Sequence, residues 1–218
     1  MKKQLTFYLI RHGRTLWNDQ RLLQGRGDSP LLEEGIRGAK LTGEALKHID
    51  FTAAYSSVLQ RTIDTAKHII GTRNIPLFQH CGLNEHFFGS WEGMLVDTIR
   101  HTPEFQQMLN DPARYTAEIN GGETYGELAE RAMNAIRDII AVHHSGNILI
   151  VSHGHTLRLL LALFDGSTWQ NHRENQRVPS LLNTAINVVR YEQNEGEING
   201  RFILDTVNSA EHLALESK

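Results

Sequence analysis

Cysteine is nearly absent from the sequence, and so are long apolar runs. Cys81 is the only cysteine among 218 residues, which excludes a disulfide within the chain and is typical of a reducing compartment. No run approaches the roughly 20 apolar residues of a membrane helix. The apolar run that follows Lys2 and Lys3 ends at Arg11, too short for a secretory signal, and no small-residue cleavage site follows. We therefore expect a soluble, cytoplasmic protein with no membrane partner.

The chain also lacks an excess of basic residues and the common metal-binding and nucleotide-binding motifs. It has 22 Lys and Arg residues and 25 Asp and Glu residues, so non-specific nucleic-acid binding is disfavoured. An anionic ligand must therefore be attracted by a local cluster of basic residues. There is no His-Glu-x-x-His pair, Cys81 has no candidate ligand partner nearby, and no Gly-x-x-x-x-Gly-Lys loop is present. We expect neither a metal nor a nucleic-acid partner.

Short apolar runs alternate with amphipathic segments along the chain. Runs such as 5–10 and 148–151 are typical of strands that are buried on both faces of a parallel sheet. The alternation predicts the α/β class, as a three-layer α/β/α sandwich with a mostly parallel central sheet and helices on both faces. We expect strands at 5–10, 53–55, 75–79, 148–151, 185–191 and 201–207, and helices at 33–47, 58–70, 125–143 and 156–163.

Two of the predicted helices begin with a capping-box pattern. Thr124 and Glu127 precede the helix at 125–143, and Ser57 and Gln60 have the same spacing before the helix at 58–70.

The chain is expected to form a single domain over residues 1–218, with an insertion over one end of the sheet at about 86–122. Short helical pieces, prolines and glycine-rich stretches interrupt the strand and helix alternation there. Loops on a rigid scaffold carry specificity, so we expect the substrate to be selected by this insertion and by the loop at 171–180. Residues 211–218 are expected to form a frayed helix or a tail.

Two histidines follow buried strands, and each precedes a glycine. His12 follows the strand at 5–10, and His153 follows the strand at 148–151. Ligands of open α/β sheets bind at the carboxyl ends of the strands, so the two histidines can converge on one site. Arg11 and Arg61 add guanidinium groups, whose fork of donors matches phosphate oxygens. A lone loop histidine is usually only solvated, but the joint pattern predicts a site for a dianion.

Residues 11–18, Arg-His-Gly-Arg-Thr-Leu-Trp-Asn, resemble the signature of the histidine phosphatase superfamily, the phosphoglycerate mutase-like family. Further segments resemble the family's motifs in the expected order, so the resemblance extends from Phe7 to at least Leu157. These segments are 24–25, 28–31, 56–62, 65–66, 83–85, 89–93, 121–124 and 152–154.

The resemblance implies a role for each matching residue. His12 would attack phosphorus as a neutral imidazole, helped by adjacent cations, and form a phosphohistidine. Glu85 would protonate the leaving oxygen and later accept a proton, although Glu92 and Glu123 are rivals in the same region. The phosphoryl oxygens would be held by Arg11, Arg61 and His153, with secondary substrate contacts from Asn18, Gln24, Gly25 and Gly154.

Two positions depart from the family's pattern. Arg14 stands where an acidic residue is common, so it either adds positive charge at the mouth of the pocket or forms a surface salt bridge. Leu32 stands where a threonine commonly caps the next helix, and Ser29 is the alternative cap through a shifted start.

The reaction itself is less constrained than the site. A mutase must retain a bisphosphorylated intermediate, but the segment 86–122 contains only Arg100 and Arg114 as Lys or Arg residues. We therefore favour a phosphomonoesterase of a small phosphorylated metabolite, which needs no cofactor. The alternative is a phosphoglycerate mutase that depends on 2,3-bisphosphoglycerate. A non-catalytic phosphate-binding regulatory module is disfavoured because all the core residues are present, and the sequence leaves open whether the chain forms a homodimer.

Overall fold

In the computed structural model, which describes residues 2–214, the predicted strands form one six-stranded sheet with the order β3-β2-β4-β1-β5-β6. Neighbouring strands run parallel from β3 through β1, whereas β5 and β6 are antiparallel additions at one edge. The mostly parallel sheet is therefore confirmed. The strands are β1 (Lys3–Arg11), β2 (Phe51–Ser56), β3 (Leu77–Gln79), β4 (Ser145–Ser152), β5 (Ile186–Gln193) and β6 (Arg201–Ser209).

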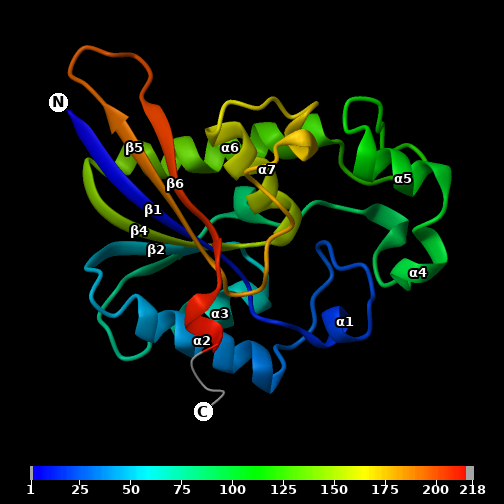
Figure 1. Cartoon of the computed structure of the whole chain (residues 1–218), viewed down its shortest axis with the longest axis horizontal. Coiled ribbons are helices and arrows are strands. Elements are labelled where there is room, and N and C mark those ends of the chain that lie inside the picture. Colours follow the sequence, from blue (N-terminus) through cyan, green and yellow to red (C-terminus); the bar gives the residue numbers. More distant parts are fainter. Residues whose placement is uncertain (1, 215–218) are drawn as a thin grey trace.

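Helices cover both faces of this sheet, as predicted (Figure 1). Alternate side chains of β1 show the two layers: Phe7 and Leu9 belong to a buried cluster with α6 (Tyr125–Val142) and α7 (Gly154–Phe164), whereas Ile10 packs in a cluster with α2 (Glu33–Ala45) and α3 (Gln60–Ile70). Successive side chains of a strand point to opposite faces, so a continuous apolar run buries both. No helix within residues 2–214 is long and apolar enough to cross a membrane.

Residues 86–122 carry three short elements on one side of the molecule, namely η2 (Gly89–Trp91), α4 (Val96–Ile99) and α5 (Pro103–Asn110) (Figure 1). Their apolar side chains, including Phe88 and Phe105, form a buried cluster with Tyr125 and Leu128 of α6. On this basis we propose that the segment is an insertion within the same domain. The remaining elements are α1 (Leu16–Asp19), η1 (Cys81–Leu83), η3 (His172–Glu174) and η4 (Glu211–Ala214). Residue 1 and residues 215–218, parts of the predicted domain and terminal tail, lie outside the described residues.

The capping box of α6 is confirmed, but that of α3 is wrong. The Thr124 hydroxyl accepts from the amide of Glu127, whose carboxylate accepts from the amide of Thr124. Helix α3 instead begins after Leu59, with no side-chain cap. The amide of Gln60 donates to the Asp28 carboxylate at 2.6 Å, so a distant loop replaces the local cap.

The N-terminus of α2 has no side-chain cap, as its Leu32 predicts. The alternative, that Ser29 caps a shifted helix, is wrong. The Ser29 hydroxyl accepts instead from the amide of Trp17 at 3.1 Å and from the Gln24 side chain at 3.0 Å. It therefore stabilises the loop between α1 and α2.

Candidate active site

The two histidines lie side by side because β1 and β4 are parallel neighbours. Arg11 and Ser152 are paired in the sheet, so His12 and His153 leave its carboxyl edge together. Their ring centroids are 5.2 Å apart, and the amide of His12 donates to the Ser152 carbonyl at 3.0 Å. Gly13 allows close backbone packing here, because a Cβ atom at this position would lie 2.5 Å from the Gly35 carbonyl oxygen. The structure thus brings both predicted histidines into one site.

The imidazole of His12 is held with one nitrogen available as a nucleophile. The Nδ1 atom lies 2.8 Å from the Gly13 carbonyl, to which it donates, and Nε2 accepts from Nε of Arg61 at 3.3 Å. Guanidinium nitrogens only donate, so Nε2 carries the lone pair. Burial, followed by the charges of Arg61 and Arg11, lowers the pKa of His12 well below its ordinary value of 6.5. The side chain is therefore a neutral base at physiological pH.

Arg61 is anchored by the loop between α1 and α2. Its buried guanidinium donates to the carbonyls of Gly25 and Gly27 at 2.6 and 2.8 Å and to the Asp28 carboxylate at 2.9 Å. Gly25, predicted as a substrate contact, therefore contributes a carbonyl that orients Arg61. This set of partners fixes the guanidinium beside His12 before any substrate binds.

Two buried nitrogens beside His12 have no hydrogen-bond partner among the described residues: Nε of Arg11 and Nδ1 of His153. Other nitrogens of the same side chains are hydrogen-bonded. Nη1 of Arg11 donates to the Leu181 carbonyl at 2.7 Å, and Nε2 of His153 lies 2.8 Å from the Ser57 hydroxyl. Gly154 leaves room for the arginine, since a Cβ there would lie 3.3 Å from the guanidinium. Unpaired buried polar groups cost free energy, so a polar ligand at this corner would be stabilised.

Glu85 is buried in the wall of the same cavity. Its carboxylate accepts from the amides of His86, His155 and Thr156 at 2.8, 3.1 and 3.0 Å, and from the Thr156 hydroxyl at 3.1 Å. Two of these amides belong to the first turn of α7, whose N–H groups have no partner within the helix.

The rivals of Glu85 are used elsewhere in the described structure. Glu92 accepts from the amides of Arg26, Gly27 and Phe88, and Glu123 forms an ion pair with Arg131. Neither lines the cavity that contains His12. Of the three glutamates, Glu85 is therefore the one that shares a cavity with His12.

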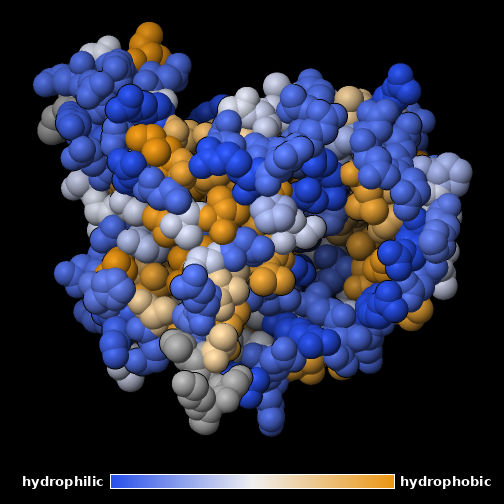
Figure 2. Space-filling view, in the orientation of Figure 1, coloured by the Kyte–Doolittle hydropathy of each residue, from blue (hydrophilic) through white to orange (hydrophobic). Residues whose placement is uncertain are grey.

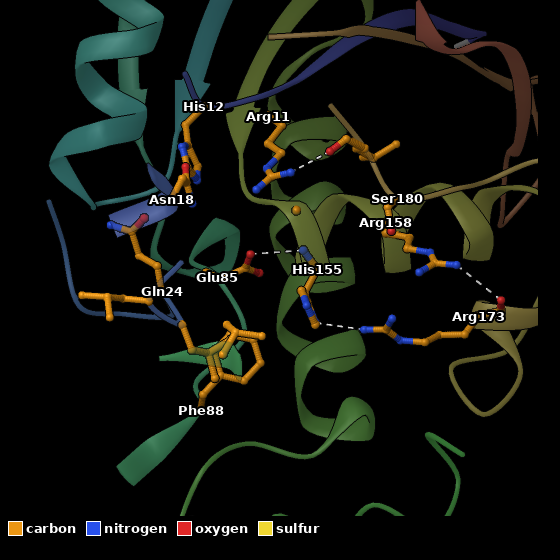
Figure 3. A pocket seen from close by; sticks show the side chains of 15 residues that line it. Arg11, His12, Asn18, Gln24, Glu85, Phe88, His155, Arg158, Arg173 and Ser180 are labelled. Atoms are coloured by element: carbon orange, nitrogen blue, oxygen red, sulfur yellow. Dashed lines mark hydrogen bonds between the residues drawn. The ribbon is translucent and has the colours of Figure 1, made fainter. Parts of the chain in front are cut away.

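These side chains surround a cavity of about 210 Å³ (Figure 3). Figure 2 shows the surface hollowed between the segments that carry α7 and α4. Arg61, His153 and Gly25 are not part of the cavity wall. Arg61 and His153 contact His12, and the Gly25 carbonyl contacts Arg61. The predicted residues that line the wall are Arg11, His12, Asn18, Gln24, Glu85 and Gly154.

Both segments that were expected to carry specificity reach the cavity. Phe88 and Val96 come from 86–122, and Arg173 and Ser180 come from 171–180. Within residues 2–214, no group of three His, Cys, Asp or Glu side chains is arranged so that it could hold a metal ion.

The sequence analysis singles out none of three polar side chains of the cavity wall, namely His155, Arg158 and Arg173. A signal for two of them was present. His155 and Arg158 are three residues apart in the helix that follows His153, and residues at this spacing share one helix face. No local pattern places Arg173 beside them.

The idea that Arg14 adds positive charge at the mouth of the pocket is wrong. Its guanidinium pairs with Asp19 at 2.8 Å and Glu34 at 3.0 Å, and it does not line the cavity. The alternative, that Arg14 forms a surface salt bridge, is confirmed. Such pairs contribute little to stability.

We expect the protein to lose stability steeply as the pH falls below about 6.5. Burial is the main cause that lowers the pKa values of His86 and His172 from 6.5 to about 4. Between pH 6.5 and pH 4 the unfolded chain binds more protons than the folded chain. The free energy of unfolding therefore decreases as the pH is lowered, by about 2 kcal/mol for each of the two histidines between pH 7 and pH 5.

Urea unfolding over this pH range tests the prediction. His172→Gln should flatten the dependence, while His101→Gln, at an exposed histidine, should leave it unchanged. A free energy of unfolding that does not vary between pH 7 and pH 5 would contradict the neutral burial of these side chains.

A model of the histidine phosphatase superfamily (branch 1) matches residues 7–203. A protein of Yersinia pestis (strain Pestoides F) named as probable phosphoglycerate mutase GpmB is 32% identical over 211 residues, covering 96% of this chain and 95% of its own.

Solved structures are similar to this chain over nearly its whole length. YhfR of Bacillus stearothermophilus is similar with a TM-score of 0.85 and 31% identity, covering 96% of this chain and 99% of its own. The alpha-ribazole phosphatase of Shigella flexneri has a TM-score of 0.78 and 27% identity, covering 94% and 96%. The relatives thus include a phosphatase and a protein named as a mutase.

Proposed function

The chain belongs to the histidine phosphatase superfamily, and on this premise we propose that it is a phosphomonoesterase that hydrolyses a small phosphorylated metabolite through a phosphohistidine at His12. The observation that carries the proposal is the state of His12, a buried neutral imidazole whose Nε2 lone pair lies beside Arg61 at the end of the cavity. Nucleophilic catalysis requires such an available lone pair.

The neighbouring groups fit the charge changes of phosphoryl transfer. Arg11, Arg61 and His153 would hold the phosphoryl oxygens, since this chemistry depends on positioning and electrostatics. His12 forms a bond to phosphorus as the ester oxygen leaves, and Glu85 gives that oxygen a proton. Glu85 then accepts a proton from water, which attacks phosphorus and releases His12 and inorganic phosphate. Asn18 and Gln24, which also line the cavity, would contact the substrate.

Hydrolysis is favoured over mutase activity by the state of the two arginines in segment 86–122. Arg100 pairs with Asp97 and Arg114 with Asp111, both on the surface, and neither lines the cavity. They supply no charge that would retain a bisphosphorylated intermediate. One observation favours a mutase as the second candidate: Arg158 and Arg173 contribute two cations to the cavity wall from elsewhere in the chain.

Phosphate release and isomerisation should be measured side by side on the purified protein, in the presence of a chelator. We expect phosphate release from small phosphate esters to exceed conversion of 3-phosphoglycerate to 2-phosphoglycerate, even when 2,3-bisphosphoglycerate is supplied. Faster isomerisation would make the protein a cofactor-dependent mutase. Binding of phosphate esters without either reaction would indicate a regulatory module.

A further inference from the structure

Two arginines line the cavity wall on the side away from His12. Arg158 lies on α7 and Arg173 on η3, and Figure 3 shows Glu85 and His155 between them and His12. Both side chains are half-buried. Neither forms an ion pair with an Asp or Glu side chain anywhere in residues 2–214. Two neighbouring cations with no acidic partner repel one another, so the arrangement is unfavourable unless an anion joins them.

The two guanidiniums are held so that part of each stays available. Arg173 donates to the Tyr125 hydroxyl from Nε at 3.2 Å and from Nη2 at 2.8 Å. Arg158 makes two longer contacts, from Nε to the Val178 carbonyl at 3.3 Å and from Nη2 to the Arg173 carbonyl at 3.4 Å. In both residues Nη1 makes no hydrogen bond within the described chain.

His155 adds a third donor to the same wall. Its Nδ1 lies 3.1 Å from Nη2 of Arg173, and because a guanidinium only donates, Nδ1 must accept. The proton of the neutral ring is therefore on Nε2, which makes no hydrogen bond within residues 2–214. Burial, followed by the charge of Arg173, lowers the pKa of His155 well below 6.5, so the ring stays neutral and keeps this N–H.

We propose that Arg158, Arg173 and the Nε2–H of His155 form a subsite for a second anionic group of the substrate, a carboxylate or a second phosphate, on the leaving-group side of the ester. The proposal rests on the phosphatase function above. Glu85, which serves the leaving oxygen in that function, lies next to this wall, since its carboxylate accepts from the amide of His155. A group attached beyond the leaving oxygen would meet the two guanidiniums, whose forked donors suit carboxylates and phosphates.

Three substrates that share a glycerol-like skeleton test the subsite. Glycerol 3-phosphate has a neutral hydroxymethyl group where 3-phosphoglycerate has a carboxylate and glycerol 1,3-bisphosphate has a phosphate. The kcat/KM values of wild type, Arg158→Gln and Arg173→Gln should be compared for all three. Arg114→Gln, at an exposed arginine outside the cavity, is the matched control.

We expect wild type to prefer at least one anionic substrate to glycerol 3-phosphate by about 10-fold or more, and either Gln variant to reduce this ratio about 10-fold, as for loss of one charge-assisted hydrogen bond. The substrate with the larger ratio identifies the anion as carboxylate or phosphate. The Arg114→Gln control should keep the wild-type ratio. An unchanged ratio in both cavity variants, or no preference in wild type, overturns the subsite.

Calorimetric binding separates failure of the subsite from failure of the proposed function. If no substrate is hydrolysed but wild type binds an anionic compound more tightly than glycerol 3-phosphate, and Arg158→Gln abolishes the difference, the subsite stands and the phosphatase function fails. Equal binding of the three compounds overturns the subsite too. Should a Gln variant not fold, Arg158→Lys and Arg173→Lys keep the charge without the fork and should lose part of the ratio.

Discussion

Replacing His12 with alanine is expected to reduce kcat/KM for every phosphate ester by about 10⁴-fold or more, because the covalent route through the histidine is lost. The Nε2 lone pair has no substitute in the site. His153 lies beside it, but in the proposed mechanism His153 holds a phosphoryl oxygen and does not attack phosphorus. Rates of phosphate release measure the effect, and His101→Ala, at an exposed histidine, is the matched control.

A trapping experiment separates loss of the nucleophile from general damage to the site. Wild-type protein incubated with a ³²P-labelled ester and stopped in alkali should carry label, because phosphohistidine survives alkaline conditions. The His12→Ala protein should carry none, and its thermal unfolding should show that it is folded. A variant that keeps a few per cent of wild-type activity would mean that water attacks the ester directly, and that His12 only binds the phosphoryl group.

The sequence predicts those parts of the site that depend only on where buried strands end and on which strands are neighbours in the sheet. Arg11 and His12 directly follow a buried apolar run, and His153 follows another, so their place at strand ends needs no tertiary information. Their proximity requires only that β1 and β4 be parallel neighbours, and they are. The same reasoning located the central sheet and its main helices.

What the sequence could not provide are contacts between segments that no short-range pattern links. Arg173 reaches the cavity because its loop packs beside two helices, where it donates to Tyr125 of α6 and to His155 of α7. The predicted capping box of α3 does not form because Asp28, more than thirty residues before Gln60, accepts from the Gln60 amide in place of Ser57. The sequence allows two environments for Arg14 because its ion pairs with Asp19 and Glu34 form only in the folded chain.

Replacing Glu85 with glutamine is expected to reduce hydrolysis in a way that depends on the leaving group. For an alkyl ester such as glycerol 3-phosphate, whose alkoxide is a poor leaving group, kcat/KM should fall about 10²–10⁴-fold, the usual contribution of general acid catalysis. For p-nitrophenyl phosphate, which leaves as a stable anion, the loss should stay below about 10-fold. Steady-state rates for both esters with the same protein preparation give the two numbers.

The comparison within one variant is its own control for folding and for phosphoryl binding. Glutamine keeps one oxygen acceptor for the amides of His86, His155 and Thr156, but its nitrogen must face one of those donors, so some disturbance of the first turn of α7 is expected. Such a disturbance would lower the rates for both esters alike, whereas loss of a proton donor lowers only the rate for the alkyl ester. Equal losses would therefore show that Glu85 positions α7 and does not act as the acid. The proton for the leaving group would then have to come from a source other than Glu85.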